Sequence, residues 1–217
     1  MDTKKLVLFD FDGVIVDTFE MCFEVGQIVL PGIERERYRS MFDGNIYEAV
    51  EDYDGVVNRD DKKYFQNYLH KLLELAPVEG IEGELEKLSS KYPLIIVTSS
   101  MGASVQEYLQ KFSLEKHFFG INGFDKGASK IKKILSALQE YKVRPKDAVF
   151  ITDTLGDMRE AEHVGVPCIG VTWGFQRREN LEKGGPDAIV SDVENLAEVV
   201  EGVLEGPKDH VGEVGSP

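Results

Sequence analysis

Short apolar runs divide this chain, and each of them ends in polar residues or glycine. The runs are Val7–Phe9, Leu94–Val97, Asp147–Ile151, Cys168–Val171 and Ala188–Val190. Runs of this length without a polar interruption are typical of parallel strands that are buried on both faces. Helical patterns separate them, at Gly80–Ser90, Ala103–Lys111, Leu155–Val164 and Val193–Leu204. The alternation predicts an α/β fold built on a parallel sheet.

Residues 17–76 have a different pattern, with helices and no convincing strand. Apolar residues recur at helical spacing in the last part of this stretch, after Asp60 and Asp61, and Pro77 ends it. Shorter helices are expected over Phe19–Leu30, Arg35–Phe42 and Ile46–Val50. The pattern therefore predicts two units, a sheet core formed by residues 1–16 and 77–217 and a helical insert formed by residues 17–76.

Composition limits the classes of partner. The 217 residues carry a net charge of −14, which argues against a broad nucleic-acid-binding surface and against attraction to an anionic membrane. The two cysteines, Cys22 and Cys168, form no zinc or disulfide pattern, and no apolar run is long enough for a transmembrane helix. We expect a cytoplasmic protein, monomeric or homodimeric, in which any anionic substrate meets a few placed cations or a metal.

The first apolar run ends in Asp10-Phe11-Asp12-Gly13, where chemistry is expected. Side chains two positions apart on an extended segment point the same way, so Asp10 and Asp12 can converge on one spot. Two carboxylates there repel each other unless one is protonated or a cation lies between them. Aspartates that merely end a strand are the simpler alternative.

A second polar group, Thr98-Ser99-Ser100, follows the strand Leu94–Val97. A hydroxyl followed by free backbone N–H groups at the start of the next helix can bind an anion. Capping of that helix by Thr or Ser is the structural alternative.

The third feature is the run from Asp125 to Lys130, which leads into a helix with Ile131, Ile134, Leu135, Leu138 and Tyr141 on one face. Ser129 is expected to cap this helix, which places Lys130 in its first turn. A cation there opposes the helix dipole, and an anion in front of the helix would remove that penalty. Lys126 is the alternative to Lys130, whereas Lys132 and Lys133 are expected to be solvated.

The fourth feature is Asp153-Thr154-Leu155-Gly156-Asp157, which follows the strand Asp147–Ile151 after Thr152. A strand-to-helix turn with this spacing brings Asp153 and Asp157 to the same edge of the sheet as Asp10 and Asp12. A cluster with only oxygen ligands selects a hard octahedral cation, and Mg²⁺ is the expected one. Helix capping by an aspartate explains one of these two residues but not both.

Together these segments resemble the four motifs of the haloacid dehalogenase superfamily, in its phosphoglycolate-phosphatase-like branch. The resemblance implies a Rossmann-like parallel sheet with a small α-helical cap, the role that it gives to residues 17–76. It also implies that Asp10 is the nucleophile, Asp12 the general acid and base, Thr98 a phosphate ligand, and Lys130 the cation that neutralises the phosphate. Asp12 would give the metal its backbone carbonyl. The usual Lys-Pro-x-Pro setting of the lysine is missing, and Thr152 stands where many relatives have glycine.

The resemblance further implies that the loop containing Gly44 and Asn45 faces the site and that Ser99 lies beside the phosphate. The expected reaction is Mg²⁺-dependent hydrolysis of a small phosphorylated metabolite through an aspartyl-phosphate. A phosphomutase uses the same four motifs and stays open as an alternative. A non-catalytic protein that binds phosphorylated metabolites is the alternative from another class.

Overall fold

The computed structural model of this protein describes residues 4–57 and 61–206. Within these ranges, six strands form one parallel sheet in the order β3-β2-β1-β4-β5-β6. The strands are β1 (Leu6–Phe9), β2 (Leu94–Val97), β3 (Gly120–Asn122), β4 (Ala148–Thr152), β5 (Cys168–Val171) and β6 (Ala188–Val190). The order reverses direction between β1 and β4, and the crevice beyond the carboxyl ends at such a point is where open α/β sheets bind ligands. The structure thus confirms a Rossmann-like α/β fold.

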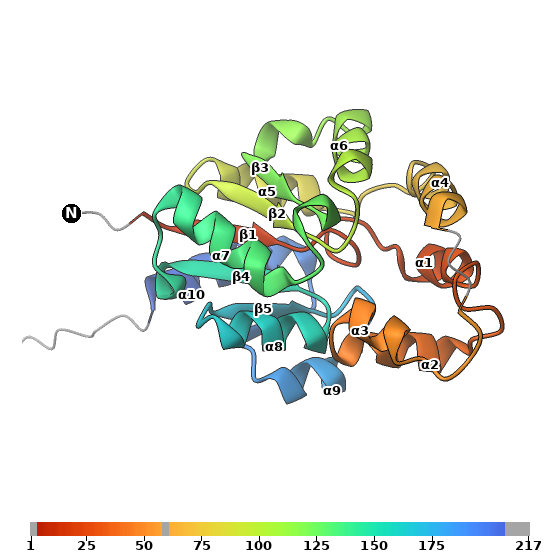
Figure 1. Ribbon diagram of the computed structural model, residues 1–217. Coiled ribbons are helices and arrows are strands. Elements are labelled where there is room, and N and C mark those ends of the chain that lie inside the picture. The colour runs from red at the N-terminus through yellow and green to blue at the C-terminus, as the bar shows by residue number, and fades with distance from the viewer. Residues whose placement is uncertain (1–3, 58–60, 207–217) are drawn as a thin grey trace, which may run out of the picture.

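Helices cover both faces of the sheet. The helices of the sheet core are α5 (Ile81–Ser89), α6 (Gly102–Lys111), α7 (Lys130–Tyr141), α8 (Leu155–His163), α9 (Arg178–Leu181) and α10 (Leu196–Glu205). The helices α7 and α8 lie on one face, and α5 and α10 lie on the other (Figure 1).

The alternation of side chains along β1 explains why both faces are apolar. Val7 and Phe9 belong to the hydrophobic cluster under α5 and α10, whereas Leu6 and Leu8 belong to the cluster under α7 and α8. All four are fully buried. Burying an apolar side chain of this size contributes roughly 1.5–3 kcal/mol, so the central strand is fixed from both sides.

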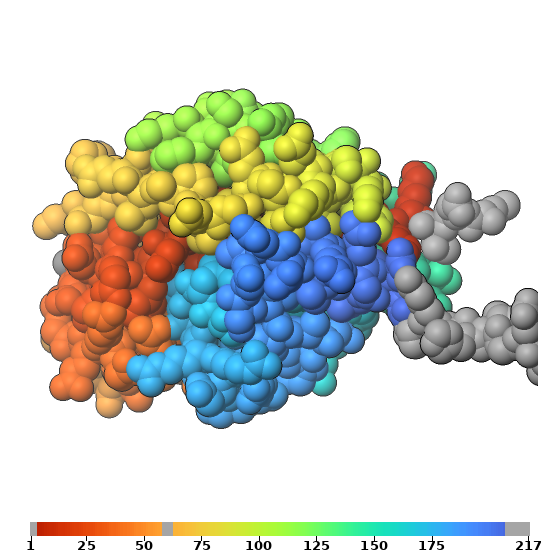
Figure 2. All heavy atoms as spheres, turned by 180° about the vertical axis from the view of Figure 1, so that it is seen from behind, coloured from red at the N-terminus to blue at the C-terminus, as the bar shows by residue number. Residues whose placement is uncertain are grey.

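The helical insert follows β1 and contains α1 (Phe19–Gly26), α2 (Arg35–Ser40), the 3₁₀ helix η1 (Met41–Asp43), α3 (Ile46–Glu51) and α4 (Asp61–Leu72). These helices lie beyond the carboxyl end of β1, and they form a red-to-orange block at one end of the molecule (Figures 1 and 2). The boundaries of the insert at residues 17 and 76 stay a prediction. The helix start expected at Asp60 and the core residues 207–217 lie outside the described residues.

The strands agree well with the sequence pattern. β2, β5 and β6 have the predicted bounds, and the other predicted strands are shifted by a residue at one or both ends. The pattern does not predict β3, because a strand of Gly, Ile and Asn has no apolar run. Among the described residues, no helix is both long enough and apolar enough to cross a bilayer.

The predicted orientation of α7 is wrong at two positions. Lys133, expected in solvent, is only 1% exposed, and its ammonium donates to the Thr98 carbonyl at 2.6 Å. Leu135, expected on the buried face, is 47% exposed. The buried face of α7 is rotated from the predicted one, because Lys130 and Lys133 point into the protein and Leu135 then points into solvent. Ser129 occupies the N-cap position, but its side chain makes no capping hydrogen bond.

A glycine in α8 sets how closely the insert approaches the sheet core. A Cβ at Gly156 would lie 2.3 Å from the Gly44 carbonyl oxygen, whereas a Cβ at Gly83 in α5 would meet nothing within 4 Å. A separation of 2.3 Å is a clash with backbone, so only glycine fits at position 156 without moving the insert.

We expect Gly156→Ala to lower the free energy of unfolding by about 1–3 kcal/mol, because the added methyl group pushes the Gly44 loop away. Gly83→Ala is the matched control and should raise it by up to about 1 kcal/mol, since alanine is the better helix former. Urea unfolding measures both. Equal shifts for the two variants would mean that the insert does not pack on α8 as described.

Candidate active site

The carboxyl ends of β1 and β4 lie side by side at the centre of the sheet. The Asp10 amide donates to the Ile151 carbonyl at 2.8 Å, and Asp153 follows two residues after Ile151. Gly13 turns the chain away from this point with a φ of +74°, and a Cβ there would lie 1.8 Å from Asp153 Oδ2. Both the left-handed backbone and the close approach require glycine.

Lys130 joins two of the predicted aspartates. Its ammonium lies 2.6 Å from Asp10 Oδ2 and 2.5 Å from Asp157 Oδ2, and all three side chains are buried. Asp157 Oδ2 also accepts from the Thr152 hydroxyl at 2.8 Å. Thr152 therefore orients Asp157.

The site buries more negative charge than Lys130 balances. Burial raises the pKa of Asp10 well above its usual value, and the Asp157 and Asp153 carboxylates add to the effect although Lys130 opposes it. Burial likewise raises the pKa of Asp153 to about 7, against the hydrogen bond from the Phe175 amide. Burial disfavours the charged form of Asp157 too, but Lys130 outweighs it and lowers the pKa of Asp157. For Lys130, burial opposes the charge, and the two carboxylates overcome it and raise its pKa.

Asp153 has the features of a cation ligand. Its side chain is 0% exposed, and its Oδ2 accepts from the Phe175 amide at 2.6 Å. Its Oδ1 is buried and has no hydrogen-bond partner among the described residues. An unpaired buried carboxylate oxygen is costly, so a cation beside it would remove a penalty. The described residues contain no group of three or more His, Cys, Asp or Glu side chains placed to hold a metal ion together. This arrangement still fits Mg²⁺, which commonly takes one or two carboxylates and completes its shell with water and substrate oxygens.

The Asp12 carboxylate has a separate set of partners. Its Oδ1 accepts from the Thr18 and Tyr68 hydroxyls, each at 2.8 Å, and its Oδ2 accepts from the Ser100 hydroxyl at 2.6 Å. The Ser100 and Tyr68 hydroxyl oxygens lie 2.9 Å apart. Because Tyr68 belongs to α4, the helical insert takes part in holding Asp12. Sequence reasoning missed Tyr68 and Ser100. The Thr-Ser-Ser run carried a signal for Ser100, whereas Tyr68 looked like any aromatic residue of an amphipathic helix.

The residues after β2 occupy the edge of the same site. The Thr98 side chain is fully buried, and its hydroxyl oxygen accepts from the Ser100 amide at 3.0 Å. The Ser99 carbonyl accepts from the Tyr47 hydroxyl at 2.6 Å. The sequence pattern did not predict the role of Lys133, whose ammonium stabilises this turn by donating to the Thr98 carbonyl. Burial lowers the pKa of Lys133 to about 8. Lys126, the alternative lysine, is exposed and donates to Asn122 Oδ1.

A cavity of about 230 Å³ lies between these residues and the helical insert. Its lining includes all the predicted site residues: Asp10, Asp12, Gly44, Asn45, Thr98, Ser99, Lys130, Asp153 and Asp157. Asn45 caps α3 by accepting from the Tyr47 amide at 3.0 Å, and it donates to Glu160 of α8 at 3.4 Å. The structure therefore brings residues of all four motifs and of the insert loop around one enclosed space.

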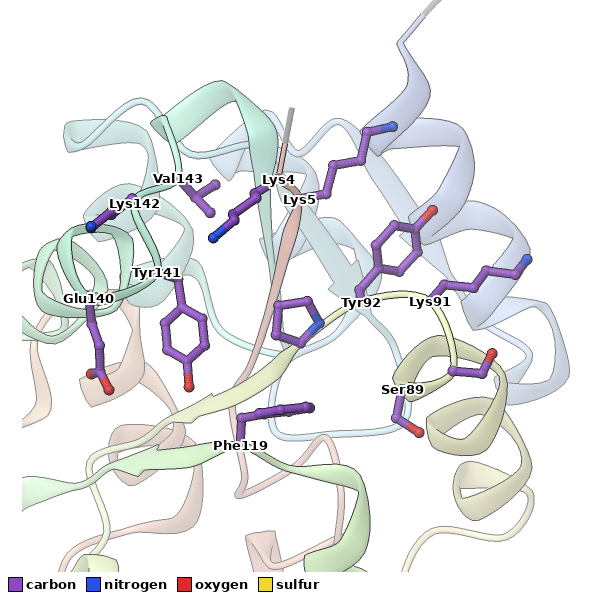
Figure 3. A pocket seen from close by; sticks show the side chains of 12 residues that line it. Lys4, Lys5, Ser89, Lys91, Tyr92, Phe119, Glu140, Tyr141, Lys142 and Val143 are labelled. Carbon is purple, nitrogen blue, oxygen red and sulfur yellow. The ribbon is translucent and has the colours of Figure 1, made fainter. Parts of the chain in front are cut away.

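A larger hollow, of about 830 Å³, lies at the opposite end of the sheet (Figure 3). Its rim includes four lysines, Lys4, Lys5, Lys91 and Lys142. They do not converge, because the Lys91 ammonium is paired with Glu201 at 2.6 Å and the Lys5 side chain extends away from the hollow. We therefore assign the chemistry to the smaller cavity.

Comparison with known proteins agrees with this geometry. The family model described as haloacid dehalogenase-like hydrolase matches residues 7–171. The chain belongs to this family. A phosphoglycolate phosphatase of Vibrio parahaemolyticus is 22% identical, with 90% of this chain and 96% of that protein covered. A probable phosphatase of Dickeya dadantii is 25% identical, with 91% and 92% covered.

The fold of this hydrolase is also found in solved structures. A haloacid dehalogenase-like family hydrolase from Streptococcus pneumoniae has a TM-score of 0.77 at 25% identity, with 92% of this chain and 99% of that chain covered. The resemblance inferred from the four motifs is therefore confirmed at the level of fold and family.

The buried Lys130 provides a test that needs no substrate. We expect Lys130→Met to lower the free energy of unfolding by about 3–5 kcal/mol at pH 7.5 without metal, because two buried carboxylates lose their cation. The loss should shrink at pH 5, since the unpaired carboxylates of the variant can take up protons in the folded state and their folded pKa exceeds the unfolded value. Urea unfolding at the two pH values measures this.

Lys126→Met is the matched control. It removes an exposed ammonium four residues earlier and should change the free energy of unfolding by less than about 1 kcal/mol at both pH values. Similar losses for the two variants would contradict the buried charge network.

Proposed function

We propose that this enzyme is a Mg²⁺-dependent phosphatase that hydrolyses a small phosphomonoester through an aspartyl-phosphate on Asp10. The observation that carries the proposal is the contact of the buried Asp10 carboxylate with Lys130 on the cavity wall, beside the unpartnered Asp153 Oδ1. The names of the two relatives, a phosphoglycolate phosphatase and a probable phosphatase, support the same reaction class.

In the proposed first step, a carboxylate oxygen of Asp10 attacks phosphorus and the bond between phosphorus and the ester oxygen breaks. The leaving alkoxide takes the proton carried by Asp12 and departs as an alcohol. In the second step, Asp12 takes a proton from water, and the hydroxide attacks the aspartyl-phosphate. Inorganic phosphate leaves, and Asp10 returns to its carboxylate form.

The phosphoryl group would lie against Thr98, Ser99 and Lys130. The lysine supplies a fixed positive charge. The start of α6 adds little to it, because the Gly102 amide already donates to Asp125 Oδ1 at 2.9 Å. Lys133 has no place in direct binding, because its ammonium is committed to the Thr98 carbonyl. We assign it to holding the turn after β2 in position.

Bound Mg²⁺ would offset the repulsion among the carboxylates and the phosphoryl oxygens and orient the phosphoryl group for in-line attack. The residues that would hold it are Asp10 and Asp153 through carboxylate oxygens and Asp12 through its backbone carbonyl. Asp157 would lie beside them, held by Lys130 and Thr152.

The helical insert would act as a cap over this site. Three contacts support the proposal: Tyr68 with Asp12, Tyr47 with the Ser99 carbonyl, and Asn45 with Glu160. Closure of such a cap keeps water away from the reacting groups, and its loop at Gly44 and Asn45 would lie next to the substrate.

We expect the purified protein with Mg²⁺ to release inorganic phosphate from phosphomonoesters, and Asp10→Asn to reduce kcat at least about a thousandfold, because an amide is no nucleophile. Asp54→Asn, at a position whose side chain is 88% exposed, is the matched control and should keep full activity. Phosphate release measures the reaction, and circular dichroism checks the fold.

Three outcomes would contradict this function. An isomerised sugar phosphate without net phosphate release would identify a phosphomutase. Tight binding of phosphorylated metabolites without any turnover would identify a binding protein. Full activity of Asp10→Asn would remove Asp10 from the chemistry.

A second prediction concerns Tyr68. Tyr68→Phe deletes one hydrogen bond to the Asp12 carboxylate and should lower kcat roughly ten- to a hundredfold, since a bond to a charged group contributes about 1.5–3 kcal/mol. KM should stay within about threefold, because the hydroxyl contacts Asp12 and Ser100 rather than the substrate. Steady-state kinetics measures both constants.

Tyr64→Phe is the matched control, because Tyr64 stacks beside Tyr68 in α4 at 6.3 Å between ring centroids. It keeps the ring and leaves the hydrogen bonds to Asp12 in place, so kcat should hold. A rise in KM with unchanged kcat in Tyr68→Phe would instead make Tyr68 a substrate-binding residue.

A further inference from the structure

The two ends of the 230 Å³ cavity differ in chemistry. The catalytic end carries Asp10, Asp153, Asp157 and Lys130. The remaining wall comes mostly from the helical insert and is aromatic and aliphatic, with Tyr38, Phe42, Tyr47, Tyr64, Phe65 and Tyr68 as its rings. A phosphoryl group takes part of this space, so the group attached to it must be compact.

The charged side chains of the lining are distributed unevenly. Among the described residues that line the cavity, Lys130 is the one lysine or arginine, and its ammonium is already shared by Asp10 and Asp157. The charged groups elsewhere on the wall are carboxylates, Glu51 at the end of α3 and Glu160 of α8. Among the described residues of the lining, a second anionic group of a substrate would therefore meet carboxylates and no further lysine or arginine.

The polar groups of the insert offer little compensation to an anion. The Tyr68 hydroxyl donates to Asp12, the Tyr47 hydroxyl donates to the Ser99 carbonyl, and the Asn45 amide donates to Glu160. The faces of aromatic rings are themselves negative. The Tyr38 and Tyr64 hydroxyls, which also line the cavity, are neutral donors and bring no charge. An anion moved from water into this wall therefore loses its hydration and gains at most neutral partners, whereas an apolar group gains from leaving water.

We propose that the substrate is a phosphomonoester whose alcohol part is compact, uncharged and apolar or aromatic, without a second anionic group. The assignment rests on the proposed phosphatase function. It separates this enzyme from phosphatases whose substrate carries a carboxylate or a second phosphate, and it makes the helical insert the part of the chain that chooses the substrate.

The test compares three phosphomonoesters with the full-length enzyme and Mg²⁺. Isobutyl phosphate and 2-phosphoglycolate form a matched pair, because a dimethyl-substituted carbon in the first replaces the carboxylate of the second with nearly the same shape. Benzyl phosphate adds an aromatic ring without charge. We expect kcat/KM for isobutyl and benzyl phosphate to exceed that for 2-phosphoglycolate at least tenfold. A preference for 2-phosphoglycolate, or equal values, overturns the assignment and leaves the phosphatase function standing. Release of phosphate from none of the three overturns the proposed function, and the assignment with it.

A positive charge introduced into the cavity wall tests whether the lack of a cation there causes the proposed discrimination against anionic substrates. Val50 of α3 lines the cavity, and Val50→Lys would give an anionic group the cation that it lacks. We expect this variant to raise the ratio of kcat/KM for 2-phosphoglycolate to that for isobutyl phosphate at least tenfold.

Glu48→Gln is the control, since it changes the net charge by the same amount on the same helix, at an exposed position outside the lining. Its ratio should stay within twofold of the unaltered enzyme. An unchanged ratio in a folded Val50→Lys variant, or an equal rise in Glu48→Gln, overturns the proposed cause. If Val50→Lys does not fold, the matched substrate pair on the unaltered enzyme decides the assignment.

Discussion

The main constraint on this structure is the burial of carboxylates at the ends of the adjacent strands β1 and β4. Asp10 and Asp153 lie 5% and 0% exposed, and Asp157 is buried behind them. A buried charge without a partner would cost more than most single contacts can return. The Lys130 ammonium offsets part of this cost for Asp10 and Asp157. Hydrogen bonds from the Thr152 hydroxyl to Asp157 and from the Phe175 amide to Asp153 offset a further part. Among the described residues no hydrogen-bond donor compensates Asp153 Oδ1, and this is where we propose that a cation binds.

The sheet topology makes this concentration of charge possible. Because β1 and β4 are neighbours at the point where the strand order reverses, chain segments far apart in sequence end at the same crevice. Close packing then requires glycine. A Cβ at Gly13 or Gly174 would lie 1.8 or 2.2 Å from Asp153 Oδ2, and a Cβ at Gly156 would meet the insert. These glycines allow backbone to reach the carboxylate and allow the insert to approach the sheet core.

The sequence predicted what depends on local pattern and on motif. Buried strands such as Leu94–Val97 have no polar interruption, so their bounds could be read directly, and Asp10 and Asp153 follow such strands at once. Features that depend on tertiary contacts could not be read. Lys133 is buried because its ammonium donates a hydrogen bond to the Thr98 carbonyl, and the helical periodicity of the sequence does not indicate this contact. The contact of Tyr68 with Asp12 joins residues 56 positions apart, and its helix pattern indicated only an amphipathic helix.

Helices α3 and α4 of the insert make different contacts with the site, and this difference determines which substitutions can change substrate specificity alone. Helix α4 supplies Tyr68, which holds Asp12, whereas α3 supplies Ile46 and Val50 to the cavity wall; no hydrogen bond from these two apolar side chains to Asp12 is possible. Substitutions at Ile46 and Val50 can therefore alter the fit of the alcohol part of the proposed substrate without disturbing the group proposed to transfer the proton. Substitutions at Tyr68 that remove the ring change both at once, because the ring lines the wall and the hydroxyl binds the carboxylate. Substrate choice can thus vary through α3 while the geometry at Asp10, Asp12 and Lys130 is preserved.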